Sequence, residues 1–263
     1  MITAFLKKVV LSMCLILFAY HVHPKYKLIV AANRDEFYER STLQAHFWED
    51  CPNILAGRDL EKMGTWMGVT TTGRFAALTN YRNPKENTQG KRSRGELVAR
   101  ALKHEGKIQA FMQKVSEENT LYPGYNLLAG DINELFYYSN VGKELQKVRP
   151  GIYGLSNHLL NSNWPKVEKG KLELSKIIDG KRNVIGADLM GLLQYSDPFQ
   201  DELLPDTGVS PEMERMLSPL FIKSDHYGTR SSTVLLASDN HAKYVERVFS
   251  KQGYKDNEYL IQW

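Results

Sequence analysis

The stretch that decides the fold is Met13-Cys-Leu-Ile-Leu-Phe-Ala-Tyr20 followed, after a short polar turn, by Lys27-Leu-Ile-Val-Ala-Ala-Asn-Arg-Asp-Glu36. Each half holds a short apolar run with aromatic or β-branched residues and turn residues at its ends. This pattern predicts a β-hairpin of two buried strands. Because the strands of a hairpin are antiparallel, we expect Cys14 near the far end of the second strand, where Asp35 lies. A thiol close to an acid and a cation indicates a candidate catalytic site.

The composition is that of an ordinary globular protein, with 42% hydrophobic and 24% charged residues. The net charge is only +4, and no basic stripe with interleaved aromatic residues occurs, so nucleic acid is not a predicted partner. The two cysteines, Cys14 and Cys51, form neither a disulfide framework nor a metal-binding spacing. We therefore predict no metal and a reducing, cytoplasmic location.

The first residues allow two interpretations. Lys7-Lys8 followed by the apolar residues 9–20 resembles a secretory signal, and Leu11-Ser-Met-Cys14 approaches a lipoprotein processing box. However, Met13 replaces the small residue that such processing requires, and the apolar run continues past the cysteine. The run is also too short to span a bilayer, so stable membrane insertion is not expected. We favour residues 1–12 as an upstream extension, Met13 as the biological start and residues 13–263 as a single domain; export is the alternative.

Further strands are predicted from apolar alternation between turn residues. A hairpin is expected over residues 65–80 with Gly73 at its turn, and another over residues 125–139 around Asn133. Residues 37–52 are rich in turn residues and are predicted to be a loop. The remaining predicted strands or extended segments are residues 53–59, 148–157, 220–223, 231–238, 244–249 and 259–262.

Helical periodicity occurs in two pairs of segments. Ser93 and Glu96 have the spacing of a capping box, which predicts that a helix begins at residue 94 and continues to residue 104. Trp164-Pro165 opens a later helix. The other predicted helices are residues 108–117, 167–178 and 187–194, the second of which follows Trp164-Pro165. The order of the predicted elements is strands, a helix pair, strands, a second helix pair and strands again. This order predicts an α+β fold, a four-layer α/β/β/α sandwich with two mostly antiparallel sheets.

Several short motifs occur together in a characteristic order. The chain is similar in them to the NRDE family, which is also the transport and Golgi organisation protein family. The motifs are Asn33-Arg-Asp-Glu36, Gly64-Thr-Trp-Met-Gly68, Leu78-Thr-Asn-Tyr81, Arg94-Gly-Glu-Leu97, Tyr153-Gly-Leu-Ser-Asn157 and Tyr227-Gly-Thr-Arg230. Family members typically begin Met-Cys, which supports Met13 as the start.

That family in turn resembles the cysteine N-terminal-nucleophile hydrolases, such as penicillin V acylase and bile-salt hydrolase, which share the predicted sandwich. The resemblance implies that removal of Met13 gives Cys14 both a thiol and an α-amine, whose ordinary pKa of about 8 suits a general base. It also implies a role for four further residues. Asp35 would orient the amine, Asn80 and Asn157 would place the substrate and hold the oxyanion, and Arg230 would favour the thiolate.

One position departs from the acylase pattern. The acylases carry an arginine three residues before the aspartate, where this chain has Ala32. Either another cation substitutes for it, or the hydrolytic chemistry is weakened or lost. Arg34 is adjacent to Asp35 but on a strand would face the opposite side. We include Arg34, Tyr81 and His158 as candidate substrate-binding residues.

The predicted function is therefore a possible amidohydrolase acting on a small acylated substrate, and whether it is an enzyme stays open. The alternative is a non-enzymatic haem-trafficking carrier, because relatives are linked to haem movement. Its candidate ligands are His21, His23, Cys51 and His158, without a Cys-x-x-Cys-His attachment signal. A third alternative is an inactive scaffold, with Cys14 a buried hydrophobe and the asparagines turn formers. No cofactor is required, although haem is an alternative ligand, and the oligomeric state is not predicted.

Overall fold

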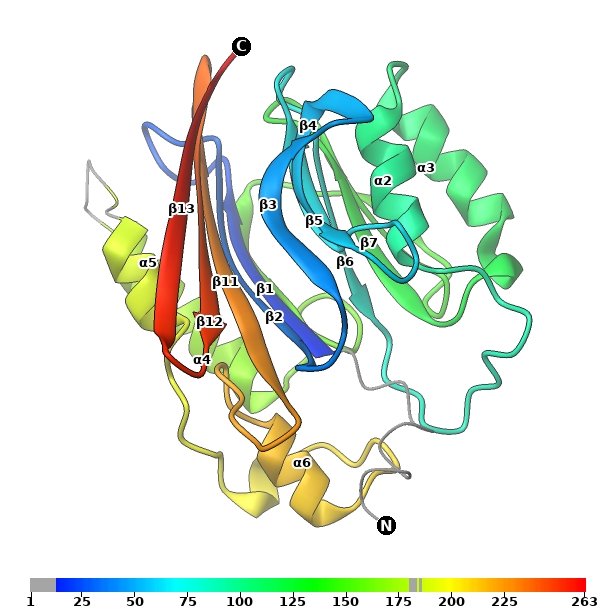
Figure 1. Cartoon of the computed structure of the whole chain (residues 1–263), viewed down its shortest axis with the longest axis vertical. Coiled ribbons are helices and arrows are strands. Elements are labelled where there is room, and N and C mark those ends of the chain that lie inside the picture. The colour runs from blue at the N-terminus through cyan, green and yellow to red at the C-terminus, as the bar shows by residue number, and fades with distance from the viewer. Residues whose placement is uncertain (1–12, 180–183, 185) are drawn as a thin grey trace.

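Two antiparallel β-sheets packed face to face form the centre of the protein, and helices cover their outer faces (Figure 1). The structure is a computed structural model that describes residues 13–179, 184 and 186–263, so the predictions for residues 1–12 lie outside the described part. The six-stranded sheet has the order β10 (Gly151–Leu155), β1 (Met13–Tyr20), β2 (Leu28–Phe37), β11 (Tyr227–Ala237), β12 (His241–Ser250) and β13 (Gly253–Gln262).

The second sheet runs through the chain in sequence order, so each strand pairs with the next one. Its strands are β3 (Thr42–Trp48), β4 (Cys51–Asp59), β5 (Met67–Thr70), β6 (Phe75–Asn80), β7 (Tyr125–Gly130), β8 (Leu135–Ser139) and β9 (Leu145–Lys147). Gly73 has a φ of 83° at the β5–β6 turn, a backbone conformation that L side chains rarely adopt. The two predicted hairpins are therefore present.

The helices occupy the two outer layers and one end of the sandwich. Apolar side chains of α2 (Gly95–Lys103) and α3 (Ile108–Glu117) share a core with the seven-stranded sheet. Those of α4 (Pro165–Ile178) and α5 (Gly186–Leu192) share a core with the six-stranded sheet. Helix α6 (Pro211–Leu217) lies below the sheets in Figure 1. This arrangement is the predicted four-layer α/β/β/α sandwich.

Strand β1 shows why the opening segment is apolar on both faces. Ile16 and Phe18 point into the core between the sheets, whereas Leu15 and Leu17 point into the core beneath α4 and α5. All eight residues of β1 are buried, because both of its faces are covered. A strand buried on both faces has a continuous apolar sequence in place of an alternating one.

Three local predictions were wrong. Residues 37–52 are not a loop, because β3 occupies most of them; bulges interrupt its pairing with β4 and so break the apolar alternation. Residues 220–223 do not form a strand: residues 220–222 are buried, and the exposed Lys223 makes only an isolated bridge with Gly228. Ser93 does not cap α2, since the N-cap residue is Arg94 with no side-chain cap bond, and Glu96 instead pairs with Arg92.

Four short elements in the described part of the chain were not predicted: the strand β9, the helix α6 and the 3-10 helices Asn119–Leu121 and Asp201–Leu203. The Ser210 hydroxyl accepts a hydrogen bond from the Met213 backbone and Pro211 follows it, so the start of α6 has ordinary helix chemistry. Among the described residues, no helix is long and apolar enough to cross a membrane.

Candidate active site

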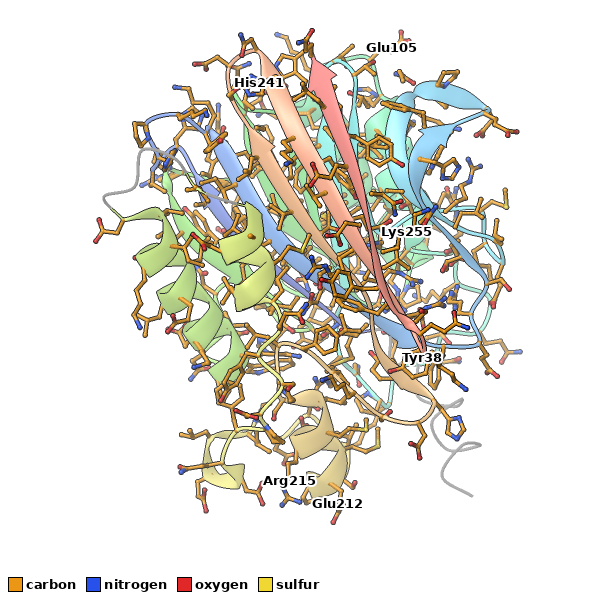
Figure 2. The ribbon with its side chains drawn as sticks, turned by 60° about the vertical axis from the view of Figure 1, so that its left-hand side comes forward. Tyr38, Glu105, Glu212, Arg215, His241 and Lys255 are labelled. Carbon is orange, nitrogen blue, oxygen red and sulfur yellow. The ribbon has the colours of Figure 1, made fainter. Side chains whose placement is uncertain are left out.

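A cavity of about 420 Å³ opens where β1 begins and β2 ends. Four of the predicted site residues line it: Cys14, Arg34, Asn80 and Arg230. Figure 2 shows Tyr38, which directly follows β2, near the α6 end of the molecule, whereas His241 lies at the opposite end. The volume is within the range of small-molecule sites. The fold brings together residues that are more than 200 positions apart in the sequence, such as Cys14 and Arg230.

The register of the opening hairpin determines which side chains face the cavity. Cys14 pairs with Arg34, and Met13 pairs with Asp35. Residues directly opposite each other on paired strands project from the same face of a sheet, and successive residues alternate. The Cys14 thiol and the Arg34 guanidinium therefore share the inner face, and the Asp35 carboxylate lies on the helix-covered face.

The same alternation explains the Asn33-Arg-Asp-Glu36 signature. Arg34 and Glu36 line the cavity, and a 3.7 Å contact joins their charged groups. Asn33 faces the helices, where its amide nitrogen donates hydrogen bonds to the backbone oxygens of Leu193 and Leu220 at 2.9 and 2.7 Å. Asn33 thus holds neighbouring backbone in place, whereas Arg34 is available to a ligand.

Asp35 belongs to a buried polar cluster behind Cys14. Its Oδ1 accepts a 2.6 Å hydrogen bond from the Thr229 hydroxyl, and its Oδ2 has no hydrogen-bond partner among the described residues. The Lys166 ammonium, on the first turn of α4, is the charge that most favours the ionised carboxylate. Burial still raises the pKa of Asp35 and lowers that of Lys166, because both charged forms lose hydration.

Met13 occupies the space next to this cluster. Its backbone N–H donates a 2.8 Å hydrogen bond to the Tyr227 hydroxyl. Its side chain is 1% exposed and packs with Leu217, Ile222 and Tyr227. In the chain that retains Met13, Cys14 therefore has a backbone amide where the proposed base would be an amine.

The backbone nitrogen of Cys14 is held by Asn157. It donates to the Asn157 Oδ1 over 3.4 Å, and the Asn157 amide nitrogen donates to the Asn80 carbonyl at 2.9 Å. The Ser156 hydroxyl donates to the Cys14 carbonyl at 3.1 Å. Both asparagines are therefore beside Cys14.

Arg230 reaches the cavity through a β-bulge. Thr229 pairs with Asp35 and Ser231 with Arg34, so Arg230 is the additional residue between them. A bulge redirects a side chain from regular alternation. The Arg230 guanidinium donates to the backbone oxygens of Phe37 and Arg40, and it lines the cavity with Arg34.

The Cys14 thiol is not activated in this form of the chain. Burial, followed by the charge of Asp35, raises its pKa to about 12, and Arg34 offsets only part of this effect. The sequence-based expectation of a thiolate favoured by Arg230 concerns the chain that begins at Cys14, and it stays a prediction. An α-ammonium at Cys14, which removal of Met13 would create, is the positive charge that this environment lacks.

Ala32 is completely buried in the core between the sheets, where an arginine would not fit without displacing neighbours. Arg34 lies two residues further along the same strand and therefore on the same face. Arg34 is therefore a cation on the inner face, directly opposite Cys14. The sequence had indicated only that Arg34 faces away from Asp35. That Arg34 pairs with Cys14 is known only from the register of β1 and β2 in the structure.

The other candidate residues lie elsewhere. The rings of Tyr81 and His158 are in contact, with centroids 5.1 Å apart and planes tilted by 37°, and neither residue is among those that line the cavity. His21 and His23 are in the β1–β2 turn, at the opposite end of β1 from Cys14, and Cys51 begins β4. In the described part of the chain, no group of three or more His, Cys, Asp or Glu residues could hold a metal ion.

Sequence reasoning missed Lys166 and Arg94. Lys166 is only 2% exposed and its ammonium donates to the Leu217 carbonyl at 2.9 Å, but in sequence it is one lysine of a lysine-rich helix. Arg94 lines the cavity and was noted only as part of a motif. Nothing in the sequence around Lys166 indicates that it is buried, whereas the motif that contains Arg94 could have indicated a functional residue.

The fold and the position of Cys14 define the class as a protein with the N-terminal-nucleophile-hydrolase fold. The N-acylethanolamine-hydrolyzing acid amidase ortholog of Caenorhabditis elegans has this fold; it superposes with a TM-score of 0.52 and 12% identity over 85% of this chain and 92% of that one. Residues 13–251 match the family model for Transport and Golgi organisation 2. The chain belongs to that family, also known as the NRDE family.

Three animal relatives agree with this assignment. The transport and Golgi organization protein 2 homolog of Bos taurus is 38% identical and that of Homo sapiens 36%, each over 89% of this chain and 92% of the relative. The Drosophila melanogaster protein of the same name is 31% identical over 90% and 93%.

Proposed function

We propose that this protein is a cysteine amidohydrolase that cleaves a small acylated substrate with the Cys14 thiol as nucleophile, once Met13 has been removed. The observation that carries the proposal is that the thiol and the backbone nitrogen of Cys14 lie in two different environments. Its thiol faces a cavity with Arg34 and Arg230, and its backbone nitrogen is held by Asn157 one register position from Asp35. The amidase that shares the fold cleaves N-acylethanolamines, which contain the same type of bond.

In the proposed reaction the Cys14 amine accepts the thiol proton, and the thiolate attacks the amide carbonyl carbon. The carbonyl oxygen becomes an oxyanion that accepts a hydrogen bond from the Asn157 amide at the Asn80 side of the cavity. The ammonium then protonates the leaving nitrogen as the C–N bond breaks, which leaves an acyl thioester. A water molecule then gives a proton to the amine and attacks the thioester carbon, and the C–S bond breaks to release the carboxylic acid. The ammonium returns that proton to the Cys14 thiolate, which restores the thiol and the amine.

Asp35 supports this sequence from behind the sheet. Its Oδ2 has no hydrogen-bond partner among the described residues, and a carboxylate stabilises a neighbouring ammonium. Lys166 in turn favours the ionised form of Asp35. The amine would therefore be oriented, and its protonated form stabilised, by a group outside the substrate cavity.

The test compares three chains on a panel of N-acyl amides: one that begins at Cys14, one that retains Met13, and a Cys14→Ala variant. We expect turnover only from the first. Cys51→Ala is the matched control, because Cys51 is the other free cysteine and does not line the cavity. Turnover that survives Cys14→Ala would exclude Cys14 as the nucleophile, and equal turnover with and without Met13 would exclude its α-amine as the base.

Haem carriage stays a second, weaker proposal. In the described residues, the candidate iron ligands His21, His23, Cys51 and His158 do not line the cavity. A haem titration of the parent chain and of a His158→Ala variant tests it. If the amide panel yields no turnover and haem binds tightly enough to pass to an acceptor protein, the enzyme proposal is abandoned in favour of the carrier.

A further inference from the structure

The walls of the cavity are strongly basic. Eight of its lining residues are Lys or Arg, and three are Asp or Glu, whereas the whole chain has a net charge of only +4. Clefts lined by one sign of charge concentrate the electrostatic field and attract ligands of the opposite sign. The excess of positive charge is therefore a property of the cavity and not of the surface in general. A ligand of this cavity is expected to carry negative charge.

Among the described residues, four of these eight cations have a carboxylate partner, namely Arg34, Arg40, Arg58 and Arg92. Of the other four, Lys62 and Lys91 are exposed and Arg230 donates to two backbone oxygens, so Arg94 differs from all of them. Arg40 pairs with Asp59 at 2.6 Å, and Arg92 pairs with Glu96. Within residues 13–179, 184 and 186–263, Arg94 forms no ion pair, and its guanidinium makes one hydrogen bond, to the Gly124 carbonyl at 2.9 Å. A guanidinium has five N–H donors, so several remain for a ligand.

The chain fixes Arg94 beside the cavity by a close backbone contact. A Cβ atom added to Gly64 would lie 2.6 Å from the Gly95 carbonyl carbon, and the Thr65 N–H donates to the Gly95 oxygen at 3.2 Å. This contact requires glycine and holds the start of α2, which Arg94 precedes. The Arg94 side chain takes no part in capping that helix.

Arg94 is also electrostatically close to the nucleophile. Burial lowers its pKa to about 10, so the guanidinium stays charged at neutral pH. The charge of Glu86 offsets part of this effect, followed by those of Glu36 and Cys14. Apolar side chains line the same cavity, among them Trp66 and Leu78. The cavity thus combines a cation without a carboxylate partner, an apolar wall and the Cys14 thiol.

We propose that Arg94 binds the anionic group, a carboxylate or a phosphate, of an amphipathic substrate whose apolar part packs against Trp66 and Leu78. This inference rests on the proposed use of the cavity as the substrate site. It names the substrate class as an anion that carries an apolar chain. Arg94 is then a specificity-determining residue, because an uncharged ligand of the same length would gain nothing from it.

Isothermal titration of the Cys14→Ala chain with decanoate, decyl phosphate and neutral 1-decanol tests the proposal. We expect at least one anion to bind about tenfold or more tightly than 1-decanol, since charge-assisted hydrogen bonds are the stronger kind. Arg94→Gln should abolish this preference without weakening 1-decanol binding, and Arg94→Lys should retain most of it. The anion that Arg94 favours identifies the headgroup as carboxylate or phosphate.

Arg100→Gln is the matched control, because Arg100 lies on α2, the helix that Arg94 precedes, but pairs with Glu118 outside the cavity. Thermal denaturation of each variant verifies that it is folded. Equal binding of anions and 1-decanol, or an Arg94→Gln effect no larger than that of Arg100→Gln, would overturn the inference. Because Cys14→Ala lacks the nucleophile, the titration is independent of turnover. Hydrolysis without anion preference refutes only this inference, and anion binding without hydrolysis refutes only the proposed reaction.

Discussion

Replacement of Asp35 by asparagine isolates the charge of the buried cluster behind Cys14. Asparagine can still accept the hydrogen bond that the Thr229 hydroxyl gives to Asp35, so the substitution removes mainly the negative charge. Lys166 then becomes a buried ammonium without its principal favourable charge. Removal of one partner from a buried ion pair costs about 3–5 kcal/mol. Lys166 can also lose its proton instead of staying charged. The cost therefore cannot exceed the free energy of deprotonating an ordinary lysine at pH 7, which is about 5 kcal/mol at 1.36 kcal/mol per pKa unit.

The assay is urea-induced unfolding of Asp35→Asn, Lys166→Met and the double variant, followed by tryptophan fluorescence. We expect Asp35→Asn to lower the free energy of unfolding by about 3–5 kcal/mol and the double variant to recover at least about 2 kcal/mol, since no buried charge is left uncompensated. Asp59→Asn is the control, because its partner Arg40 is partly exposed and such pairs contribute about 1 kcal/mol or less. A loss below about 1 kcal/mol for Asp35→Asn, or a double variant no more stable than the single one, would refute the reasoning.

Three further predictions concern the cavity side of the sheet. The raised pKa of Cys14 means that little thiolate exists at pH 8 while Met13 is attached, so alkylation of Cys14 should be slow at that pH. In the chain that begins at Cys14, the pH profile of alkylation should shift by about 2 pH units or more to lower pH, and identical profiles would contradict the role of the ammonium. Arg34→Gln should move the alkylation profile in the opposite direction, by about 1 pH unit, because Arg34 lowers the pKa of the thiol. Asn157→Ala should reduce turnover about 10²-fold or more, measured as kcat, and a change confined to KM would show that Asn157 only binds substrate.

The fold was largely predictable because its strands and helices have strong local patterns. The apolar run of β1 and the glycine turn at Gly73 indicated hairpins, and ordered helix pairs between strand groups indicated the layers. Strand β3 was missed because its pairing with β4 is interrupted at two points, so buried Ala45 and Trp48 do not follow a period of two. Where tertiary pairing overrides the local period, the sequence has no pattern to read.

The candidate site was predictable only as a set of residues. The family motifs placed Cys14, Asn80 and Arg230 in one site, and all three line the cavity. The face that each residue occupies depends on the hairpin register and on the bulge at Arg230, and a shift of one residue would exchange the faces. Lys166 was not predicted, because its burial follows from the docking of α4 and not from any local signal.

Intact-mass measurement of the chain that begins at Cys14, acid-quenched within seconds of mixing with N-acyl amides, tests the central claim most directly. The account predicts a population heavier by the mass of the acyl group, located at Cys14 by peptide mapping and absent from both Cys14→Ala and the chain that retains Met13. The adduct should disappear as the thioester is hydrolysed. An acyl group located on another residue, or amide turnover together with an unmodified Cys14 at every quench time and no effect of Cys14→Ala, would contradict the account.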